Sequence, residues 1–417
     1  RTPVKLAFFL LSTAIFASAQ AATPTPDLPS PEIVARILRE TPAIQAAAAQ
    51  LRSEEANRRR LEAGPHEWSV RLGSQQRKTL PANATEQNFN EWNAAVERPL
   101  RLPGKGALDS EIGVAGVNVA TSGLGDARHE ASRALLKGWF GWLRESAAAK
   151  QWQAQVMLLE QQDRAVQRRQ QLGDAARLEA VQSAAALAQA QAQSLQAQVR
   201  QRTSEEELRR QFPGLPLTAP HKISEPQPLP GSESEWIDAI LAHNHELAIA
   251  RSETRRAQLL AERARSERLP DPSFGVQYAR ERGGEEKVLG AYLSIPLPGA
   301  ARKAGADASH AQAEAYAALE SKTQRKAMSE AASLYQNTLA AYPGWQAAAK
   351  AAAQLTQSAD MTARAYRLGE GTLSEVLTAR RQANESQLAA QQAQLDALEL
   401  RYRLALDAHQ LWDLDDD

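Results

Sequence analysis

Hydrophobic and polar positions along this chain follow two patterns, one typical of strands and one typical of long helices, and both patterns occur twice in the same order. In the first half, the runs from Trp68 to Ser74 and from Trp92 to Glu97 alternate with a period of two, which predicts strands. In the second half, Phe274 to Tyr278 and Val288 to Ile295 predict strands again. Long stretches rich in Ala, Gln, Glu, Arg and Leu surround these runs, and this composition predicts long helices.

The helical stretches divide at clear turn signals. One helix is predicted over about 31–63 and a second over about 233–269, each before a strand pair. A long helical region follows each pair, interrupted once by a glycine turn. The predicted turn residues are Leu172, Gly173 and Asp174 in the first half and Leu368, Gly369, Glu370 and Gly371 in the second. The predicted breakers between strands and long helices are Pro99, Pro103, Gly104, Pro296, Pro298 and Gly299.

These landmarks recur at offsets of about 195 to 206 residues, which indicates a tandem duplication and not a short solenoid repeat. Chance similarity between Ala-rich helices would not reproduce the ordered strand, proline, helix and glycine signals. The predicted organisation is a linker over 22–30, a first repeat over 31–212, a linker over 213–232, a second repeat over 233–412 and an acidic tail over 413–417.

The first residues indicate export. Arg1 and Lys5 precede an apolar run, and Ala17-Ser18-Ala19 supplies a small-x-small cleavage motif, so residues 1–21 are predicted to be a secretory signal peptide. The apolar run of roughly 12 residues is shorter than the ~20 that a membrane-spanning helix needs. No later stretch predicts such a helix, so a membrane crossing by this chain would have to use strands in a closed barrel.

Element lengths constrain the architecture. Each long helix of about 68 residues would extend roughly 100 Å. The returning helices and the helices before the strands are each about half as long, so a pair of them matches one full helix, which suits the wall of a tube. Four strands of about 8 to 11 residues suit a membrane, but barrels need at least ~8 strands. The membrane interpretation therefore requires an oligomer, with a dimer or a trimer both allowed.

Composition removes several other classes of function. The formal net charge is zero, which disfavours a nucleic-acid partner. The chain has no cysteine, so disulfides, thiolate metal sites and an N-terminal lipid anchor are excluded. His243 and His245 are two residues apart and would point in different directions on one helix, so no metal site is predicted there. No catalytic constellation is present, so neither an enzyme nor a cofactor is predicted.

One segment carries a more specific signal. From Ala365 to Ala379, an aromatic residue, a glycine turn and an acid-Val-Leu stretch follow one another. This segment resembles the periplasmic tip motif of the TolC-like outer-membrane factors of efflux and secretion systems, and the resemblance extends over the mature chain. The stretches around Pro103 and from Ile295 to Pro298 resemble the CzcC-like heavy-metal efflux branch.

The resemblance implies a mainly helical fold with four transmembrane strands per protomer. Three copies would close a 12-stranded barrel in the outer-membrane lipid, continued by a long α-helical barrel through the periplasm. The tips at Gly173 and Gly369 would contact a periplasmic adaptor, which links to an inner-membrane resistance-nodulation-division pump. By position, Tyr366 and Glu375 match gate residues of the family. Thr378 stands where some members carry a second acid, so an acidic ring would be weaker here.

The predicted function is therefore a passive export duct in the outer membrane and periplasm, with heavy-metal cations as the cargo that the branch resemblance implies. Organic drug efflux and type I protein secretion remain alternatives on the same scaffold. A periplasmic coiled-coil adaptor or structural protein is a further alternative. Adaptors carry one helical hairpin, and the duplication with four amphipathic strands argues against that class.

Overall fold

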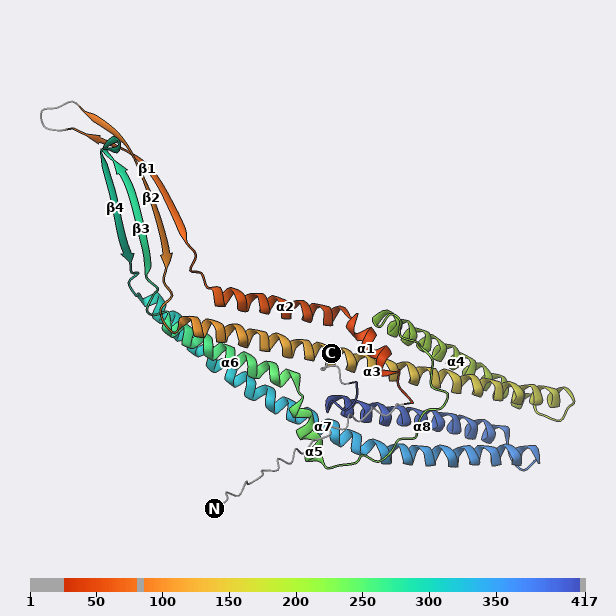
Figure 1. The fold of residues 1–417 in the computed structure, drawn as a ribbon. Coiled ribbons are helices and arrows are strands. Elements are labelled where there is room, and N and C mark those ends of the chain that lie inside the picture. Colours follow the sequence, from red (N-terminus) through yellow and green to blue (C-terminus); the bar gives the residue numbers. More distant parts are fainter. Residues whose placement is uncertain (1–25, 81–85, 413–417) are drawn as a thin grey trace, which may run out of the picture.

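The computed structural model describes residues 26–80 and 86–412 as a long molecule with a β-sheet at one end and helical hairpins at the other (Figure 1). The predicted signal peptide and acidic tail lie outside the described residues. The first repeat contains α1 Pro31–Arg39, α2 Pro42–Ala63, β1 Ser69–Thr79, β2 Gln87–Pro99, α3 Lys105–Gln171 and α4 Arg177–Gln211. The second contains α5 Glu233–Ala242, α6 His245–Ser266, β3 Ser273–Glu281, the 3₁₀ turn η1 Arg282–Gly284, β4 Glu286–Ser294, α7 Ala300–Arg367 and α8 Leu373–Asp407.

Two helices are broken where the sequence predicted continuity. The helix predicted over 31–63 ends at Arg39 and restarts at Pro42, because a residue before proline favours extended backbone and Thr41 has ψ of 128°. The helix predicted over 233–269 ends at Ala242, and Asn244 caps a new helix by accepting a hydrogen bond from the Leu247 amide at 2.7 Å. The breaks give each repeat a short helix at mid-length.

The second break also changes the predicted positions of two histidines. His243 ends α5 and His245 begins α6, so they do not lie on one helix. Their ring centroids lie 4.5 Å and 5.2 Å from that of His409. The two rings therefore contact the same third ring, which one continuous helix did not predict.

The four strands form one antiparallel sheet in the order β1-β2-β3-β4. Val70 pairs with Val96, Val96 with Val276, and Val276 with Ala291. The middle pair, β2 with β3, joins the two repeats, so the sheet is a shared structure and not two separate hairpins. β1 and β4 remain as open edges.

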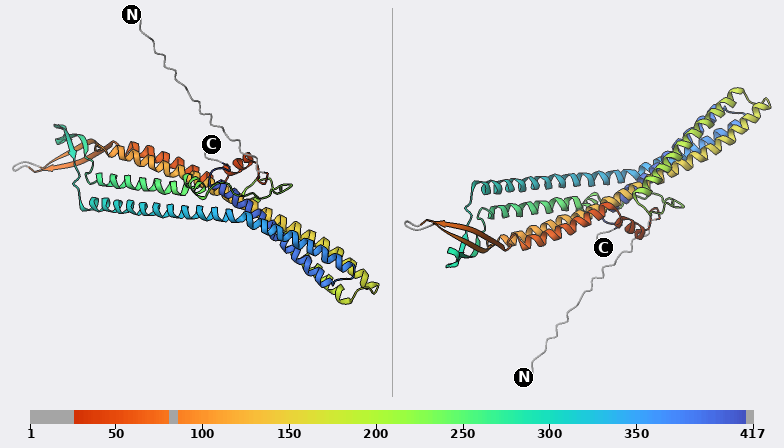
Figure 2. Two further views of the ribbon diagram at one scale, coloured as in Figure 1. Left: turned by 90° about the horizontal axis from the view of Figure 1, so that it is seen from below. Right: turned by 90° about the horizontal axis from the view of Figure 1, so that it is seen from above.

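The helices lie side by side in a row whose members change at mid-length (Figures 1 and 2). Near the sheet the order is α2, α3, α6, α7, and near the tips it is α4, α3, α8, α7. α3 and α7, with 67 and 68 residues, run through both halves, whereas α2 and α6 have 22 residues and α4 and α8 have 35. The arrangement of one continuous helix beside two stacked shorter ones, which the lengths predicted, is therefore present in both repeats.

The largest hydrophobic core lies at mid-length and not at either end. Trp139 and Phe140 of α3 are buried there with Leu38 of α1, Phe212 after α4 and Leu398 of α8. We call this region, made of α1, α5, residues 212–232 and residues 408–412 around the middle of α3 and α8, the equatorial layer. It occupies the point where the half-length helices end.

Asp27 joins separate segments of the equatorial layer through hydrogen bonds. Its side chain is fully buried, and it accepts hydrogen bonds from the Tyr402 hydroxyl at 2.9 Å and from the Ser224 amide at 2.8 Å. Its carbonyl accepts a third from Trp139 Nε1 at 2.8 Å. Residues 22–30 were predicted to be a linker, but Asp27 and its neighbour Leu28 belong to the core.

Candidate functional site

The sheet has one apolar and one polar face. Because side chains alternate along a strand, the register places the apolar residues of all four strands together. This face is open to solvent in the single chain: Leu72 is 76% exposed and Leu289 is 77% exposed. Its members include Val70, Leu72, Trp92, Val96, Phe274, Val276, Leu289 and Leu293. An apolar face of this size needs a cover, and lipid against a strand surface is one such cover.

The opposite face is occupied by ion pairs. Arg77 lies 3.0 Å from Glu91 and 2.9 Å from Glu281, which ties β1 to β2 and β3. Tyr292 of β4 donates a hydrogen bond to Glu97 of β2 at 2.8 Å. Polar side chains that satisfy one another on this face are typical of a strand surface that lines a water-filled interior.

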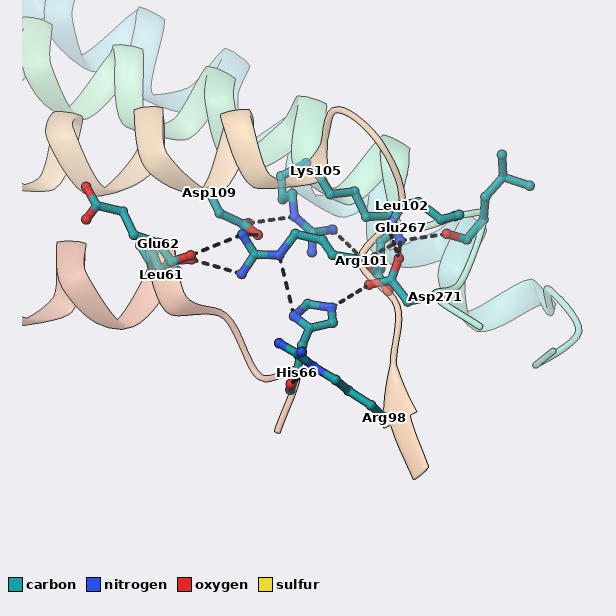
Figure 3. A network of polar contacts seen from close by, with 12 residues as sticks. Leu61, Glu62, His66, Arg98, Arg101, Leu102, Lys105, Asp109, Glu267 and Asp271 are labelled. Atoms are coloured by element: carbon teal, nitrogen blue, oxygen red, sulfur yellow. Dashed lines mark hydrogen bonds and ion pairs between the residues drawn. The ribbon is translucent and has the colours of Figure 1, made fainter. Parts of the chain in front are cut away.

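A cluster of charged side chains joins the sheet to the helices (Figure 3). Lys105, the first residue of α3, is 2% exposed and donates to the Leu269 carbonyl at 2.7 Å and to Asp271 Oδ1 at 2.9 Å. His66 Nε2 lies 3.3 Å from Asp271 Oδ2, and Arg101 donates to His66 Nδ1 at 3.4 Å. Asp271 therefore binds residues from both sides of the first strand pair, and we call this group the junction cluster.

The breaker residues behave as predicted around this cluster. β2 ends at Pro99 and α3 begins directly after Gly104, whose φ of +86° suits glycine. β4 ends at Ser294 and α7 begins directly after Gly299. Sequence reasoning missed the junction cluster, because Lys105 and Asp271 are 166 residues apart and neither stands in a recognisable motif.

The two helical tips have the same backbone. Gly173 and Gly369 have φ of +86° and +81°, and each amide donates to the carbonyl three residues earlier at 3.1 Å. The next amides, of Asp174 and Glu370, bind carbonyls five residues earlier at 2.8 Å and 3.0 Å. This pair of bonds is the Schellman motif, which ends a helix at a left-handed glycine. The glycine turns predicted from the sequence are thus observed in both repeats.

The tips present apolar side chains to solvent. Leu172 and Leu368, at matching positions before the glycines, are 72% and 67% exposed. Leu178 at the start of α4 is 66% exposed. Gly371 lies next to the capped start of α8. A partner that binds these ends would therefore meet the same leucine twice per chain.

Glu375 is engaged within its own helix. Its carboxylate accepts a hydrogen bond from the Thr372 amide at 2.8 Å, and the Thr372 hydroxyl accepts from the Glu375 amide at 3.3 Å. This reciprocal pair is a capping box. The hydrogen bonds from Thr372 lower the pKa of Glu375, so its carboxylate is charged at neutral pH.

Tyr366 lies between the two hairpins. It packs with Val166 and Ala180 of the first hairpin and with Val376 of the second. Its hydroxyl donates to Glu179 at 2.8 Å, and the Arg169 guanidinium lies 5.3 Å from its ring centroid. Burial, followed by the hydrogen bond to Glu179, raises the pKa of Tyr366 and keeps the hydroxyl a donor.

The structure therefore separates the two predicted gate residues. Tyr366 binds across the hairpins, whereas the Glu375 carboxylate faces the backbone of its own helix start. The residue that sequence reasoning missed is Glu179, although its match to Glu375 in the duplication is visible in the sequence. A gate role for any of these residues stays a prediction.

Two features are absent from the described residues. Within residues 26–80 and 86–412, no group of three or more histidine, aspartate or glutamate side chains is arranged to hold a metal ion. Among the residues that the structure describes, no helix combines the length and apolarity needed to cross a lipid bilayer.

Known proteins share this fold. The chain is similar to the CmeC outer membrane channel of Campylobacter jejuni, with a TM-score of 0.77 and 12% identity over 93% of this chain and 86% of that chain. It is similar to the outer-membrane channel OprN, with a TM-score of 0.77 and 17% identity over 93% and 92% of the two chains. For CusC, whose structures describe transmembrane channel formation, the TM-score is 0.77 and the identity 13% over 90% and 91%.

Sequence adds the family. Residues 236–406, most of the second repeat, match the profile of the family described as outer membrane efflux protein. No curated protein matches the chain in sequence. The described chain therefore has the fold of TolC-like outer-membrane channels, and residues 236–406 carry the sequence pattern of the outer membrane efflux protein family.

Proposed function

We propose that this chain is one of three identical subunits of a passive export duct that spans the outer membrane and the periplasm. An inner-membrane resistance-nodulation-division pump drives the duct through a periplasmic adaptor. The proposed cargo is heavy-metal cations. The observation that carries the proposal concerns the sheet, the helices near the sheet and the helices near the tips. Each of these three sets has two open edges, and the edges lie on the same two sides of the chain.

The open edges follow from the order of the elements. On one side, the outermost elements are β1 in the sheet, α2 among the helices near the sheet and α4 among the helices near the tips. β4 and α7 end it on the other side. Because the two edges differ, copies associate head to tail, and such a contact closes into a ring when the rotation between copies permits it.

Exposed apolar side chains along these edges support the ring. On α4, Val181 is 59% exposed and Val199 is 62% exposed, and on α7, Met361 is 65% exposed. The sheet needs the ring as well, since membrane barrels contain at least ~8 strands and one copy supplies four. Three copies supply the 12 strands that the family resemblance implies.

The adaptor contact is assigned to the two tips. The matching leucines Leu172 and Leu368 are exposed beside turns of identical hydrogen bonding. Three chains would repeat this surface six times around a ring. A protein with one helical hairpin per copy could bind each tip equivalently, which makes the surface suitable for a helical partner.

The cargo assignment rests on the breaker segments that resemble the CzcC-like branch. We infer heavy-metal cations from them, and organic compounds and secreted proteins are the competing cargoes. Tyr366, which joins the hairpins, and Glu375 are the proposed gate residues. The alternative that this chain is itself a periplasmic adaptor or a structural coiled-coil protein has less support. Adaptors carry one helical hairpin, and this chain has two, α3 with α4 and α7 with α8.

The assembly is tested by fractionation and mass. The full-length protein is expected in the outer-membrane fraction, with the mass of three chains when solubilised in detergent. A periplasmic soluble fraction, or a monomer at all concentrations, would sink the duct proposal. The double substitution Leu172→Asp and Leu368→Asp should keep the trimer but abolish resistance, because it places charge on both tips.

The cargo is tested separately by deleting the gene. The deletion strain should become more sensitive to at least one of zinc, cobalt, cadmium, nickel, copper and silver, and the intact gene should restore tolerance. Unchanged tolerance to all six metals contradicts the metal assignment. Greater sensitivity to organic compounds, or loss of a secreted protein, would assign one of the competing cargoes.

A further inference from the structure

Four of the seven histidines of the chain gather in the equatorial layer. His129 belongs to α3 of the first repeat, and His243 and His245 flank the break between α5 and α6. His409 follows the end of α8 in a left-handed conformation, with φ of +55°. The cluster therefore joins the first repeat to two separate segments of the second.

The rings contact one another directly. The His243 and His409 rings are stacked, with centroids 4.5 Å apart and planes 20° from parallel. His409 lies 5.2 Å from His245 and 5.6 Å from His129, and His129 lies 5.8 Å from His245. A Cβ added at Gly125 would lie 2.5 Å from the His245 ring, so this ring packs on the α3 backbone itself. The side chains meet ring against ring, and no metal-holding group is found in this described region.

Exposure falls from one side of the cluster to the other. His243 is exposed and His245 and His409 are half-buried, whereas the side chain of His129 is 11% exposed. His129 Nε2 donates to the Leu406 carbonyl at 3.3 Å and lies 3.5 Å from Asp407. A proton taken up at the inner end therefore enters a largely dry site.

The charged neighbours come from every element around the cluster. Arg133 of α3 donates to Asp407 of α8 at 2.8 Å, and Arg403 lies 3.9 Å from the same carboxylate. Lys326 of α7 lies 2.9 Å from Glu246 of α6. The remaining acids on this side are Asp126 and Glu130 of α3 and Glu330 of α7. Asp407 is thus already balanced by two arginines and has little capacity left for an imidazolium.

Burial, and then the charge of Arg133, lower the pKa of His129 from 6.5 to about 4. A lowered histidine pKa means that the released or unfolded state takes up the proton more readily than the packed state. The packing is therefore stable above about pH 6.5 and loses stability as the pH falls from 6.5 toward 4. Stacked rings that both carry charge repel each other in addition.

We propose that His129, His243, His245 and His409 form a pH-sensitive clasp between the two repeats. Neutral rings hold the end of α8 and the α5–α6 break against α3, and protonated rings release them. The release loosens the equatorial layer and leaves the sheet and the tip turns unchanged, because the clasp contacts neither of them. The clasp is independent of the identity of the cargo.

Hydrogen exchange of the full-length protein in detergent tests the clasp. Peptides covering 236–247 and 402–412 should lose at least about tenfold protection between pH 7.5 and pH 5, after correction for the intrinsic exchange rate. Peptides of α4 away from the equator should keep theirs. Equal protection of the two clasp peptides at both pH values would overturn the proposal.

A triple variant removes three of the four protonation sites, all except that of His245, while keeping the packing. His129→Gln retains a donor for the Leu406 carbonyl, His243→Phe retains a stacked ring, and His409→Asn suits the left-handed backbone. This variant should lose most of the pH response, and a response equal to that of the native chain would contradict the clasp. His310→Gln is the matched control, because His310 is 74% exposed and pairs only with Glu314 among the described contacts.

A second measurement decides the matter even if the triple variant does not fold. Exchange of the imidazole C2 hydrogen, followed by mass spectrometry, gives a midpoint pH for each histidine of the native protein. The midpoint of His129 should lie below 6.5, toward about 4. A midpoint of His129 at 6.5 or above would refute the clasp.

Discussion

Glu179 and Glu375 stand third in α4 and α8, at the same position of the two repeats, yet they bind different partners. Glu375 caps its own helix through Thr372, whereas Glu179 accepts a hydrogen bond from Tyr366 of the other repeat. The difference starts at the N-cap, where Ala176 offers no hydroxyl and Thr372 does. One substitution at a cap thus frees a carboxylate to bind across the hairpins.

Removal of the Tyr366 hydroxyl should loosen the two tips from each other. Tyr366→Phe keeps the ring in its apolar contacts and deletes one hydrogen bond to a carboxylate, a loss of about 1.5–3 kcal/mol. Hydrogen exchange at both tip turns should accelerate by roughly tenfold or more, and conductance in a planar bilayer should rise if the contact holds a closed state.

Glu179→Gln is the matched control for this contact. It removes the charge and retains an acceptor for the Tyr366 hydroxyl, so its effect should be smaller than that of Tyr366→Phe. Tip exchange that is unchanged in Tyr366→Phe would show that apolar packing alone holds the hairpins together.

The Asp27 side chain should control access to the segment 213–232. Asp27→Ala removes the acceptor for both Tyr402 and the Ser224 amide and leaves these half-buried groups without it, at a cost of up to about 1–3 kcal/mol each. Limited proteolysis should then cut within 213–232 faster than in the native protein. Ser224→Ala should cut at the native rate, because it retains the backbone donor; faster cleavage in that control would assign the effect to the Ser224 side chain.

Acid should weaken the junction cluster. Burial acts to raise the pKa of Asp271 and of Glu267. The hydrogen bonds from the Leu102 amide and Lys105 to Asp271, and those from Arg263 and Lys105 to Glu267, outweigh it and lower the pKa of both carboxyls. Carboxyls with lowered pKa values stabilise the fold above their ordinary values of 3.8 and 4.5, and this contribution disappears as the pH falls through the lowered values.

Lys105→Met tests the same cluster at neutral pH. It leaves Asp271 without its buried cation and should reduce stability by about 3–5 kcal/mol. Melting followed by circular dichroism should show this loss, together with a flatter dependence on acid below pH 4.5. A variant with the native melting temperature would show that His66 and the Leu102 amide suffice to hold Asp271.

Two glycines of α3 should respond to alanine in opposite ways. A Cβ at Gly113 would lie 2.7 Å from Arg58 Cγ and 2.9 Å from its Cα, so Gly113→Ala must push α2 away, at about 1–3 kcal/mol. A Cβ at Gly123 meets nothing within 4 Å, and Gly123→Ala should stabilise the helix by up to about 1 kcal/mol. Melting temperatures that move in the same direction would contradict the close approach at Gly113.

Much of this architecture was predictable because it depends on local signals. Period-two alternation marked the four strands, glycine marked both tips, and proline and glycine marked the ends of the long helices. The breaks at Thr41 and Asn244 were missed, although each had a local cause, a following proline in one case and a capping side chain in the other. Long amphipathic stretches on both sides concealed them.

The polar sites were less predictable, because they join residues far apart in the chain. Tyr366 meets Glu179 at a separation of 187 residues and Asp27 meets Tyr402 at 375. The histidine cluster depends on a helix break and on the left-handed backbone of His409, neither of which a periodic pattern records. Duplication gave one usable signal, since equivalent positions with different neighbours indicate residues that have acquired a new partner.

The uninterrupted course of α3 and α7 through the equatorial layer has a mechanical consequence. Each of these two helices connects the sheet half to the tip half as one rod, whereas the shorter helices beside it end at mid-length. A tilt of the rod about its mid-point therefore moves both of its ends. An arm of about 35 residues is roughly 50 Å long, so a tilt of about 5° displaces its tip by ~4–5 Å. A small rotation at the layer that Asp27 and the histidines fasten is thus amplified at the far end of the molecule.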